Sequence, residues 1–351
     1  MDARKPGYPA CLGPRAGVSV PPMNVLVVGG AGYIGSHCVR QAVAAGHTVV
    51  VLDDLSQGHQ AAVPAGVPCI RADMADAAAV RAAVRAHRIE VAIHFAGLTN
   101  VGESVRQPER YHEHNVVRTE ALLAALLAEG VRKVVFSSTC ATYGIPGAMP
   151  MTETLPQHPI NPYGQTKLDV ERLLGRLAVS AGLSFAAFRY FNAAGAAADA
   201  AIGEDHTPET HLIPLAIAAA LGRRPPLQVF GDDYPTPDGT CLRDYVHVDD
   251  LASAHLAVLP FLGQPGTGLF YNLGTGVPRS VKEVLASVGR VTGRPVPYTI
   301  APRREGDPPE LYASAAKAAA ELGWRPRYVE LDDIVATAVR WHLARPAGYA
   351  S

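Results

Sequence analysis

Residues 24–35, which read NVLVVGGAGYIG, decide the fold of this chain. The apolar run Asn24–Val28 predicts a buried strand, and the periodicity of Ile34–Ala45 predicts a helix after it. Between them, Gly29, Gly32 and Gly35 form a GxxGxxG turn. Glycines permit a tight turn whose backbone N–H groups can approach a pyrophosphate at the positive end of the helix. The stretch therefore predicts a dinucleotide-binding turn.

An acidic residue stands where the next predicted strand ends. Thr48–Leu52 is apolar and leads to Asp53, whose carboxylate can bind both ribose hydroxyls of an adenosine. The same charge would repel a 2′-phosphate, so the cofactor predicted is NAD rather than NADP. Asp54 is a second candidate, and Asp73 either reaches the adenine or only ends a strand in a turn. A glycine-rich turn with a surface aspartate is the alternative interpretation.

Strands and helices alternate along the first half of the chain. This alternation predicts a doubly wound, parallel α/β sheet of the Rossmann type. After Asn192 prolines and glycines multiply, which predicts a smaller, irregular α/β lobe. We expect a flexible tail at 1–22, a cofactor domain at 23–191 and a second lobe at 192–351, with 241–262 packed back on the first domain. Further predicted strands are Val67–Arg71, Val91–Phe95, Lys133–Ser137 and Phe185–Tyr190.

Composition excludes several classes of function. The 351 residues carry a formal net charge of -1 and no basic run, so no nucleic-acid partner is expected. No apolar run is long enough for a membrane span. The 5 cysteines form no CxxC pair and the 13 histidines show no metal-ligand spacing, so no metal is expected. Cysteine usage of this kind fits a reducing, cytoplasmic location.

Tyr163 and Lys167 supply the chemistry. They stand at i and i+4, so a helix places them on one face. An ammonium beside a phenol stabilises the phenolate and lowers its pKa, which makes the phenol a usable base. Thr139 ends the strand Lys133–Phe136 with Ser137 and Ser138, at the edge where ligands bind in such sheets. The set predicts hydride chemistry at a carbon that bears a hydroxyl, whereas a solvated helix face and a polar strand end are the alternatives.

The chain resembles the extended short-chain dehydrogenases/reductases, and among them the UDP-galactose (UDP-glucose) 4-epimerases. The likeness covers roughly Met23 to Tyr349. Ordered matches at compatible spacing are more specific than the glycine turn alone. They are residues 94–98 (HFAGL), 101–104 (VGES), 161–164 (NPYG), 189–192 (RYFN), 230–236 (FGDDYPT), 243–248 (RDYVHV), 271–274 (YNLG) and 301–307 (APRREGD).

The resemblance implies a mechanism and a set of binding residues. Tyr163 would take the proton of the sugar's C4 hydroxyl while the C4 hydrogen passes to NAD. The 4-keto sugar would turn in the pocket and regain hydride on its opposite face. The substrate would be a UDP-hexose, and the enzyme a homodimer. On the cofactor side the resemblance adds Tyr33, Ile34, Met74, Phe95, Ala96, Gly97, Asn115, Ser137 and Phe191. On the substrate side it adds Asn192, His211, Leu212, Gln228, Phe230, Arg243, Tyr245, Arg304, Asp307 and Leu311.

Two positions depart from patterns common among the relatives. Thr139 replaces a serine, which keeps the hydroxyl. Leu311 stands where some relatives carry tyrosine and others a small residue that is associated with N-acetylated sugars. UDP-N-acetylglucosamine and UDP-arabinose therefore stay open as substrates.

Two other functions compete with a 4-epimerase. A nucleotide-sugar dehydratase or decarboxylase would need an acidic residue directly after the strand-end threonine, where Cys140 and Ala141 stand instead. A non-catalytic NAD-sensing module would usually lose the tyrosine–lysine pair, which this chain keeps.

Overall fold

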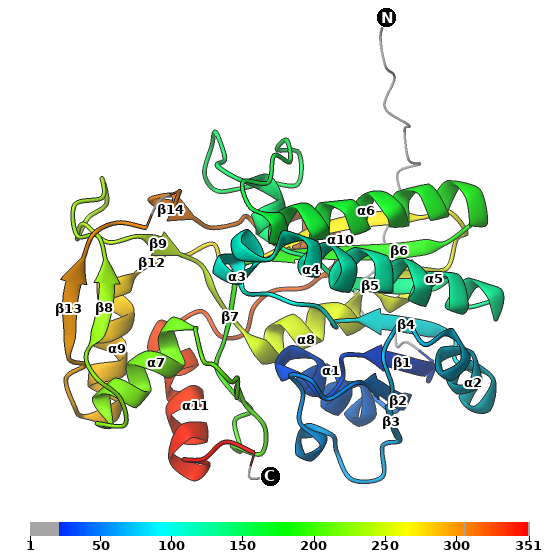
Figure 1. The fold of residues 1–351 in the computed structure, drawn as a ribbon, viewed down its shortest axis with the longest axis horizontal. Coiled ribbons are helices and arrows are strands. Elements are labelled where there is room, and N and C mark those ends of the chain that lie inside the picture. Colours follow the sequence, from blue (N-terminus) through cyan, green and yellow to red (C-terminus); the bar gives the residue numbers. More distant parts are fainter. Residues whose placement is uncertain (1–20, 305, 350–351) are drawn as a thin grey trace, which may run out of the picture.

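A seven-stranded, fully parallel sheet forms the centre of the molecule (Figure 1). The structure is a computed structural model that describes residues 21–304 and 306–349; apart from Pro21 and Pro22, the tail expected at 1–22 lies outside the described residues. The strand order is β11-β6-β5-β4-β1-β2-β3, so the doubly wound sheet is confirmed. The strands are β1 (Asn24–Val28), β2 (Thr48–Asp53), β3 (Cys69–Arg71), β4 (Val91–His94), β5 (Lys133–Ser137), β6 (Ser184–Tyr190) and β11 (Gly268–Leu273).

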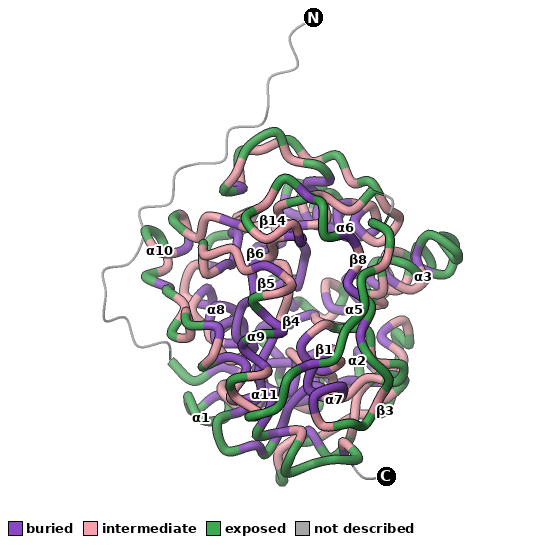
Figure 2. The backbone as a smooth tube through the Cα atoms, turned by 90° about the vertical axis from the view of Figure 1, so that its left-hand side faces the viewer, coloured by how far each residue is buried: buried purple, intermediate pink, exposed green. Residues whose placement is uncertain are grey.

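Helices cover both faces of this sheet, because its strands are apolar on both sides. Val25 and Val27 of β1 join one core cluster, and Leu26 and Val28 join the cluster on the opposite face. Figure 2 shows this interior as largely buried backbone. The first face carries α1 (Tyr33–Ala44), α8 (Val248–Ala257) and α10 (Ala316–Leu322). The second carries α2 (Ala77–His87), α5 (Arg118–Ala128) and α6 (Pro162–Ala181).

The second lobe has a core of its own beside the sheet (Figure 1). Three helices pack there with the strand β8 (Leu227–Phe230), which pairs in parallel with β13 (Tyr298–Ala301). The helices are α7 (Leu212–Ala220), α9 (Val281–Thr292) and α11 (Leu331–Ala344). Short ladders join β7 (Asn192–Ala194) to β10 (Tyr245–His247), and β9 (Leu242–Arg243) to β12 (Arg279–Ser280) and β14 (Glu310–Leu311). Between β4 and α5 lie α3 (Val101–Arg106), α4 (Pro108–His112) and the π-helical turn η2 (Glu113–Val117).

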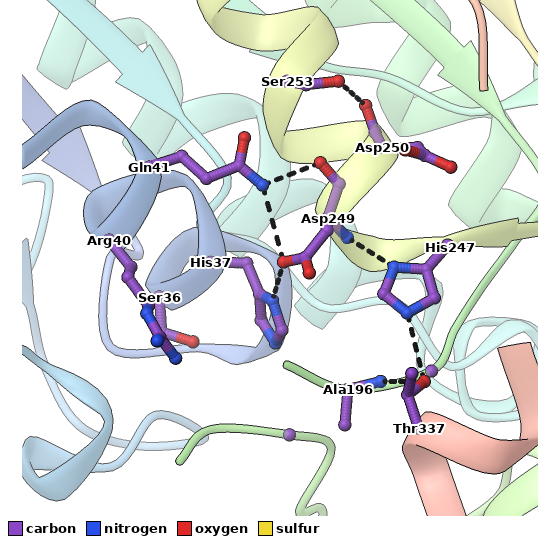
Figure 3. Close-up of polar contacts among 12 residues, drawn as sticks. Ser36, His37, Arg40, Gln41, Ala196, His247, Asp249, Asp250, Ser253 and Thr337 are labelled. Carbon is purple, nitrogen blue, oxygen red and sulfur yellow. Dashed lines mark hydrogen bonds and ion pairs between the residues drawn. The ribbon is translucent and has the colours of Figure 1, made fainter. Parts of the chain in front are cut away.

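The chain passes between the two lobes more than once. Both α8 and β11 follow residue 192 in the sequence, yet they pack on and complete the first sheet. Figure 3 shows the joint at the start of α8, where the His37 imidazole contacts the Asp249 carboxylate at 2.7 Å. His247 caps α8 through its Nδ1 atom, and its Nε2 atom lies 3.1 Å from the Thr337 hydroxyl of α11. A single cut at residue 191 therefore does not separate the two cores.

Within residues 21–304 and 306–349, no helix has both the length and the apolarity to cross a membrane.

Candidate active site

The glycine turn leaves the beginning of α1 open to an anion. Gly32 is the N-cap residue and provides no side-chain cap, and the first turn of α1 contains no acidic residue. The first N–H groups of a helix have no partner within the helix, and they carry its positive partial charge. The turn can therefore hold the pyrophosphate of a dinucleotide through backbone donors.

Close backbone contacts explain why two of these positions are glycine. Gly29 has a φ of +79°, and a Cβ atom there would lie 2.5 Å from the backbone nitrogen of Ala96. A Cβ atom on Gly35 would lie 2.0 Å from the carbonyl oxygen of Gly29. Neither neighbour can rotate away, because both are backbone atoms. The turn thus touches the loop after β4, on which the nicotinamide side is predicted.

Asp53 faces the glycine turn from the end of β2. Its carboxylate accepts hydrogen bonds from the backbone N–H groups of Ala31 and Leu55, each at 2.9 Å. Burial raises the pKa of this carboxyl, and the two backbone donors oppose the rise. The side chain is therefore fixed beside the turn, where an adenosine ribose is predicted.

The other predicted adenosine-side residues are engaged with the protein. Asp54 accepts a hydrogen bond from the N–H group of Ser56 at 2.8 Å. Asp73 accepts one from Ala75 at 2.8 Å and pairs with the Arg118 guanidinium at 2.5 Å. Met74 is buried in the core on the second face of the sheet.

Asn115 connects three elements on the predicted nicotinamide side. It lies in the π-helical turn, a feature that often occurs at functional sites. Its Oδ1 accepts from the Leu98 N–H group at 2.8 Å, and its Nδ2 donates to Leu98 O at 2.9 Å and to Thr166 Oγ1 at 3.2 Å. A Cβ atom on Gly97 would lie 3.2 Å from Asn115 Oδ1 and 3.5 Å from Lys167 Nζ. The loop Phe95–Gly97 therefore meets the helix that carries the predicted base.

The start of α6 fixes Tyr163. Asn161 caps the helix by accepting a hydrogen bond from Gly164 N at 2.8 Å, and Pro162 occupies a first-turn position. The backbone N–H group of Tyr163 donates to Ser104 Oγ at 3.2 Å. One turn later, Lys167 Nζ donates to the carbonyl oxygen of Ser137 at 3.0 Å. Helix α6 is thereby attached to the carboxyl end of β5.

The pKa values of this pair differ from the sequence prediction. Burial raises the pKa of Tyr163 to about 12, although a hydrogen bond with Thr139 opposes the rise. Burial lowers the pKa of Lys167 to about 8, opposed by the nearby Glu171 carboxylate. The protein's own groups therefore do not produce the lowered phenol pKa that the i, i+4 spacing suggested. An additional positive charge beside the phenol would favour the phenolate and lower this pKa.

Hydroxyl groups line the end of β5. Ser137 Oγ shares a hydrogen bond with the Tyr190 hydroxyl, and Ser138 Oγ donates to Glu171 Oε1 at 2.5 Å. Thr139 is directed to the Tyr163 phenol, and its Oγ1 also accepts from Ala141 N at 3.1 Å. The structure thus brings the three predicted catalytic residues together at one edge of the sheet.

In the second lobe, two of the predicted nucleotide-binding residues pair with each other. The Arg243 guanidinium forms an ion pair with Asp307. Arg304 lies over the Phe230 ring, with its guanidinium carbon 4.1 Å from the ring centroid. Asn192 donates to the carbonyl oxygen of Asp244 at 3.1 Å. These contacts fix the side chains before any ligand binds, so the predicted nucleotide site is preorganised.

Other predicted substrate residues lie in different settings. Tyr245 is buried in the core of the second lobe, Leu212 packs at its border, and Gln228 is exposed on β8. His211 contacts Glu204 and Glu209. Leu311 packs with Phe191 against a small cluster that contains Cys140. Leu311, together with the predicted cofactor residue Phe191, therefore packs beside the strand end that carries Thr139.

Comparison with known proteins identifies the family. The model of the "NAD dependent epimerase/dehydratase family" matches residues 25–274. The chain belongs to this family. A UDP-glucose 4-epimerase of Halalkalibacterium halodurans is 47% identical over 94% of this chain and 98% of that protein.

Solved structures from this epimerase/dehydratase family have the same architecture. The UDP-glucose 4-epimerase of Brucella ovis, in complex with NAD, matches with a TM-score of 0.88 and 49% identity over 91% of this chain and 98% of that chain. The enzyme of Stenotrophomonas maltophila, with NAD and formylated UDP-arabinopyranose, matches with a TM-score of 0.89 and 41% identity over 92% and 99%. The predicted family, fold class and dependence on NAD are thereby confirmed.

A buried polar network beside the predicted catalytic pair was not predicted from the sequence. Glu171 receives a two-pronged ion pair from Arg189, at 2.9 and 2.6 Å, besides the hydrogen bond from Ser138. Arg189 also donates to the Tyr143 hydroxyl at 2.9 Å, which donates to Asn272 Oδ1 at 2.7 Å. Glu171 stands one helical turn after Lys167 on the same face of α6. This i, i+4 spacing could have predicted that Glu171 lies near the lysine.

A cluster of ionisable side chains after residue 192 was likewise not predicted from the sequence. The carboxylates and imidazoles of Glu204, His206, Glu209 and His211 converge there. From the spacing of the histidines we expect no metal ligands. The spacing of this set, ExHxxExH, is not one of the common metal-binding motifs, so the sequence does not indicate it.

Proposed function

We propose that this protein interconverts UDP-galactose and UDP-glucose by inverting carbon C4 of the hexose. The observation that carries the proposal is the meeting of Tyr163, Thr139 and Lys167 at the carboxyl end of β5, beside Gly97. The relatives, which cover almost the whole chain, support the same activity. NAD, when bound, supplies the acceptor and donor of the C4 hydride.

The protein's own residues would transfer the proton and position the reacting groups. Tyr163 takes the proton of the C4 hydroxyl and later returns it, and Thr139 holds that hydroxyl and the phenol in line. Because burial raises the pKa of Tyr163 to about 12, the phenol keeps its proton until a positive charge lies beside it. The positive charge of a bound, oxidised nicotinamide would therefore favour Tyr163 as the base.

The glycine turn and Asp53 would hold the cofactor. Gly29 and Gly35 lie against neighbouring backbone atoms, and α1 begins without a side-chain cap, so this turn fits a pyrophosphate. The Asp53 carboxylate is held by backbone N–H groups and fits the ribose hydroxyls. Arg243 and Arg304 would grip the UDP diphosphate, for which guanidinium groups are suited. We retain the division into a cofactor part (23–191) and a nucleotide-sugar part (192–351), with 241–262 on the former, as a proposal about binding roles.

The structure offers no support for the competing dehydratase and decarboxylase functions at residues 140 and 141. Cys140 is buried and burial raises the pKa of its thiol well above its usual range, so it is no acid or base near neutral pH. Ala141 carries no ionisable group. The homodimer, the cytoplasmic location and the acceptance of UDP-N-acetylglucosamine or UDP-arabinose stay predictions.

One experiment tests the activity. The protein is incubated with UDP-galactose deuterated at C4 and an amount of NAD far below that of the substrate. We expect UDP-glucose that keeps the label, with no accumulation of NADH. NADH equal to the product formed would indicate a dehydrogenase, and loss of the label to water would contradict internal return of the hydride. Absence of any conversion would favour the NAD-sensing module.

A further inference from the structure

The segment Glu204–His211, which reads EDHTPETH, turns four polar side chains toward one point. It lies between β7 and α7, and His211 is the N-cap residue of α7. The ligating atoms of Glu204, His206, Glu209 and His211 all lie within 4.8 Å of one another. All four come from one short stretch of chain, so the cluster forms locally.

Four distances within the cluster, from 2.7 to 3.7 Å, bracket the edge lengths of a tetrahedral site. Metal–ligand distances of about 2.0–2.2 Å place tetrahedral ligands about 3.3–3.6 Å apart. The Glu204 Oε1 atom lies 3.3 Å from His206 Nδ1 and 2.7 Å from His211 Nδ1. Glu209 lies 3.7 Å from His206 Nδ1 through Oε2 and 3.1 Å from His211 Nδ1 through Oε1. Because all four ligand atoms lie within 4.8 Å of one another, side-chain adjustments would let the set surround one ion.

Two of these atoms lack the hydrogen bonds that burial normally demands. Glu204 is 4% exposed, and among the described residues neither its Oε1 atom nor His206 Nδ1 makes a hydrogen bond of good geometry, although Oε1 also lies 2.7 Å from His211 Nδ1 in an ion pair. Each faces the other at 3.3 Å with a geometry that does not fit a hydrogen bond. Buried polar atoms without partners are rare and call for an unplaced water or ion. Both Glu204 and His206 belong to the four residues whose ligand atoms converge in the cluster.

The chemistry of the donor set selects the ion. Imidazole nitrogens favour zinc and its neighbours over magnesium and calcium, which prefer oxygen ligands alone. A cation at a helix N-terminus is disfavoured by the helix dipole. Here the carboxylates of Glu204 and Glu209 would neutralise the charge of a divalent ion, which offsets its unfavourable interaction with the helix dipole.

We propose that Glu204, His206, Glu209 and His211 bind one divalent transition-metal ion of the zinc type. The ion fixes the segment before α7 and has a structural role. It also supports the neighbouring cofactor turn, because the Tyr33 ring packs edge-on against His206, with centroids 6.2 Å apart, and the Tyr33 hydroxyl donates to Gly195 O at 2.6 Å. This proposal does not depend on the reaction proposed above.

Metal content and zinc titration of the full-length, untagged protein test the site. After treatment with a chelator and its removal, titration with zinc chloride is expected to show one ion bound per chain. Zinc should raise Tm by on the order of 5 °C at 100-fold excess over Kd. X-ray absorption of the loaded protein should show nitrogen and oxygen ligands without sulfur. Binding below a tenth of an ion per chain, or sulfur ligands, would overturn the proposal.

Substitutions locate the ion. His206→Gln and Glu204→Gln should each weaken zinc binding at least 100-fold. Asp205→Asn is the matched control, since its carboxylate accepts a hydrogen bond from Tyr349 N at 2.8 Å and stands outside the cluster. Equal zinc affinity in all three variants would overturn the assignment. If a variant does not fold, the ligand types from X-ray absorption of the unsubstituted protein decide alone.

Discussion

The edge of the seven-stranded sheet and the second lobe hold their proposed site residues by different means. At the sheet edge, Tyr163, Lys167 and Thr139 are fixed by a capped helix and by the end of a buried strand. In the second lobe, Arg243 and Asp307 hold each other through an ion pair between short ladders. The first arrangement depends on regular secondary structure, whereas the second depends on contacts between residues far apart in the sequence.

This contrast separates positions where a substitution should affect the chemical step from positions where it should affect substrate binding. The sheet edge concentrates buried groups with displaced pKa values, so a change there should reduce the rate of the chemical step. The second lobe carries exposed and half-buried charges around the proposed diphosphate site, so a change there should weaken substrate binding. Four substitutions test this contrast.

Tyr163→Phe should have the largest effect. Loss of the general base is expected to lower kcat by about 10³-fold, while NAD stays bound because the glycine turn and Asp53 are untouched. Turnover and NAD content per chain are the measurements. Tyr298→Phe, an exposed tyrosine of β13, is the matched control. A near-native rate for Tyr163→Phe would remove this residue from the mechanism.

The sequence predicts the sheet edge well because its signals are local and periodic. The strand β1 and the i, i+4 pair each lie within one element, and the glycine turn connects two consecutive elements. The predicted bounds of the strands in the first sheet differ from the observed ones by at most two residues. Thr139 could be placed because strand ends of a parallel sheet gather at one edge.

The remaining features depend on contacts between residues far apart in the sequence, which periodic patterns do not indicate. The pairing of Glu171 with Arg189 and of Arg243 with Asp307 needs the folded chain. The raised pKa of Tyr163 follows from burial, which residue spacing alone does not measure. Likewise, β11 joins the first sheet from beyond residue 192 because the chain returns from the second lobe.

Gly35→Ala should affect the cofactor rather than the chemistry. Its new Cβ atom would lie 2.0 Å from Gly29 O, so the turn must open. Overpacking of this size costs about 2–3 kcal/mol, which corresponds to roughly 100-fold weaker NAD binding. NAD affinity is measured by titration, with Gly147→Ala as the control because a Cβ atom there meets nothing within 4 Å. Unchanged NAD affinity would show that the turn is not the cofactor site.

Arg243→Ala should separate binding from chemistry. The substitution removes the guanidinium and leaves Asp307 unpaired, and its charge would then repel a diphosphate. We expect KM for UDP-galactose to rise about 10- to 30-fold, with kcat within a few-fold of the original. Arg290→Ala is the matched control, because Arg290 pairs with Asp332 elsewhere in the lobe. A fall in kcat without a change in KM would break the contrast between the two regions.

Leu311→Ala should have the smallest effect, because it lies where the two regions meet. Leu311 belongs to β14 of the second lobe but packs in the cluster with Cys140, next to Thr139. Shortening it should widen the hexose side and raise the ratio of kcat/KM for UDP-N-acetylgalactosamine over UDP-galactose by a few-fold, in line with about 1 kcal/mol for one side-chain contact. The exposed Leu343→Ala serves as the control. An unchanged ratio would mean that the sheet edge alone shapes the hexose pocket, and that the second lobe contributes only to nucleotide binding.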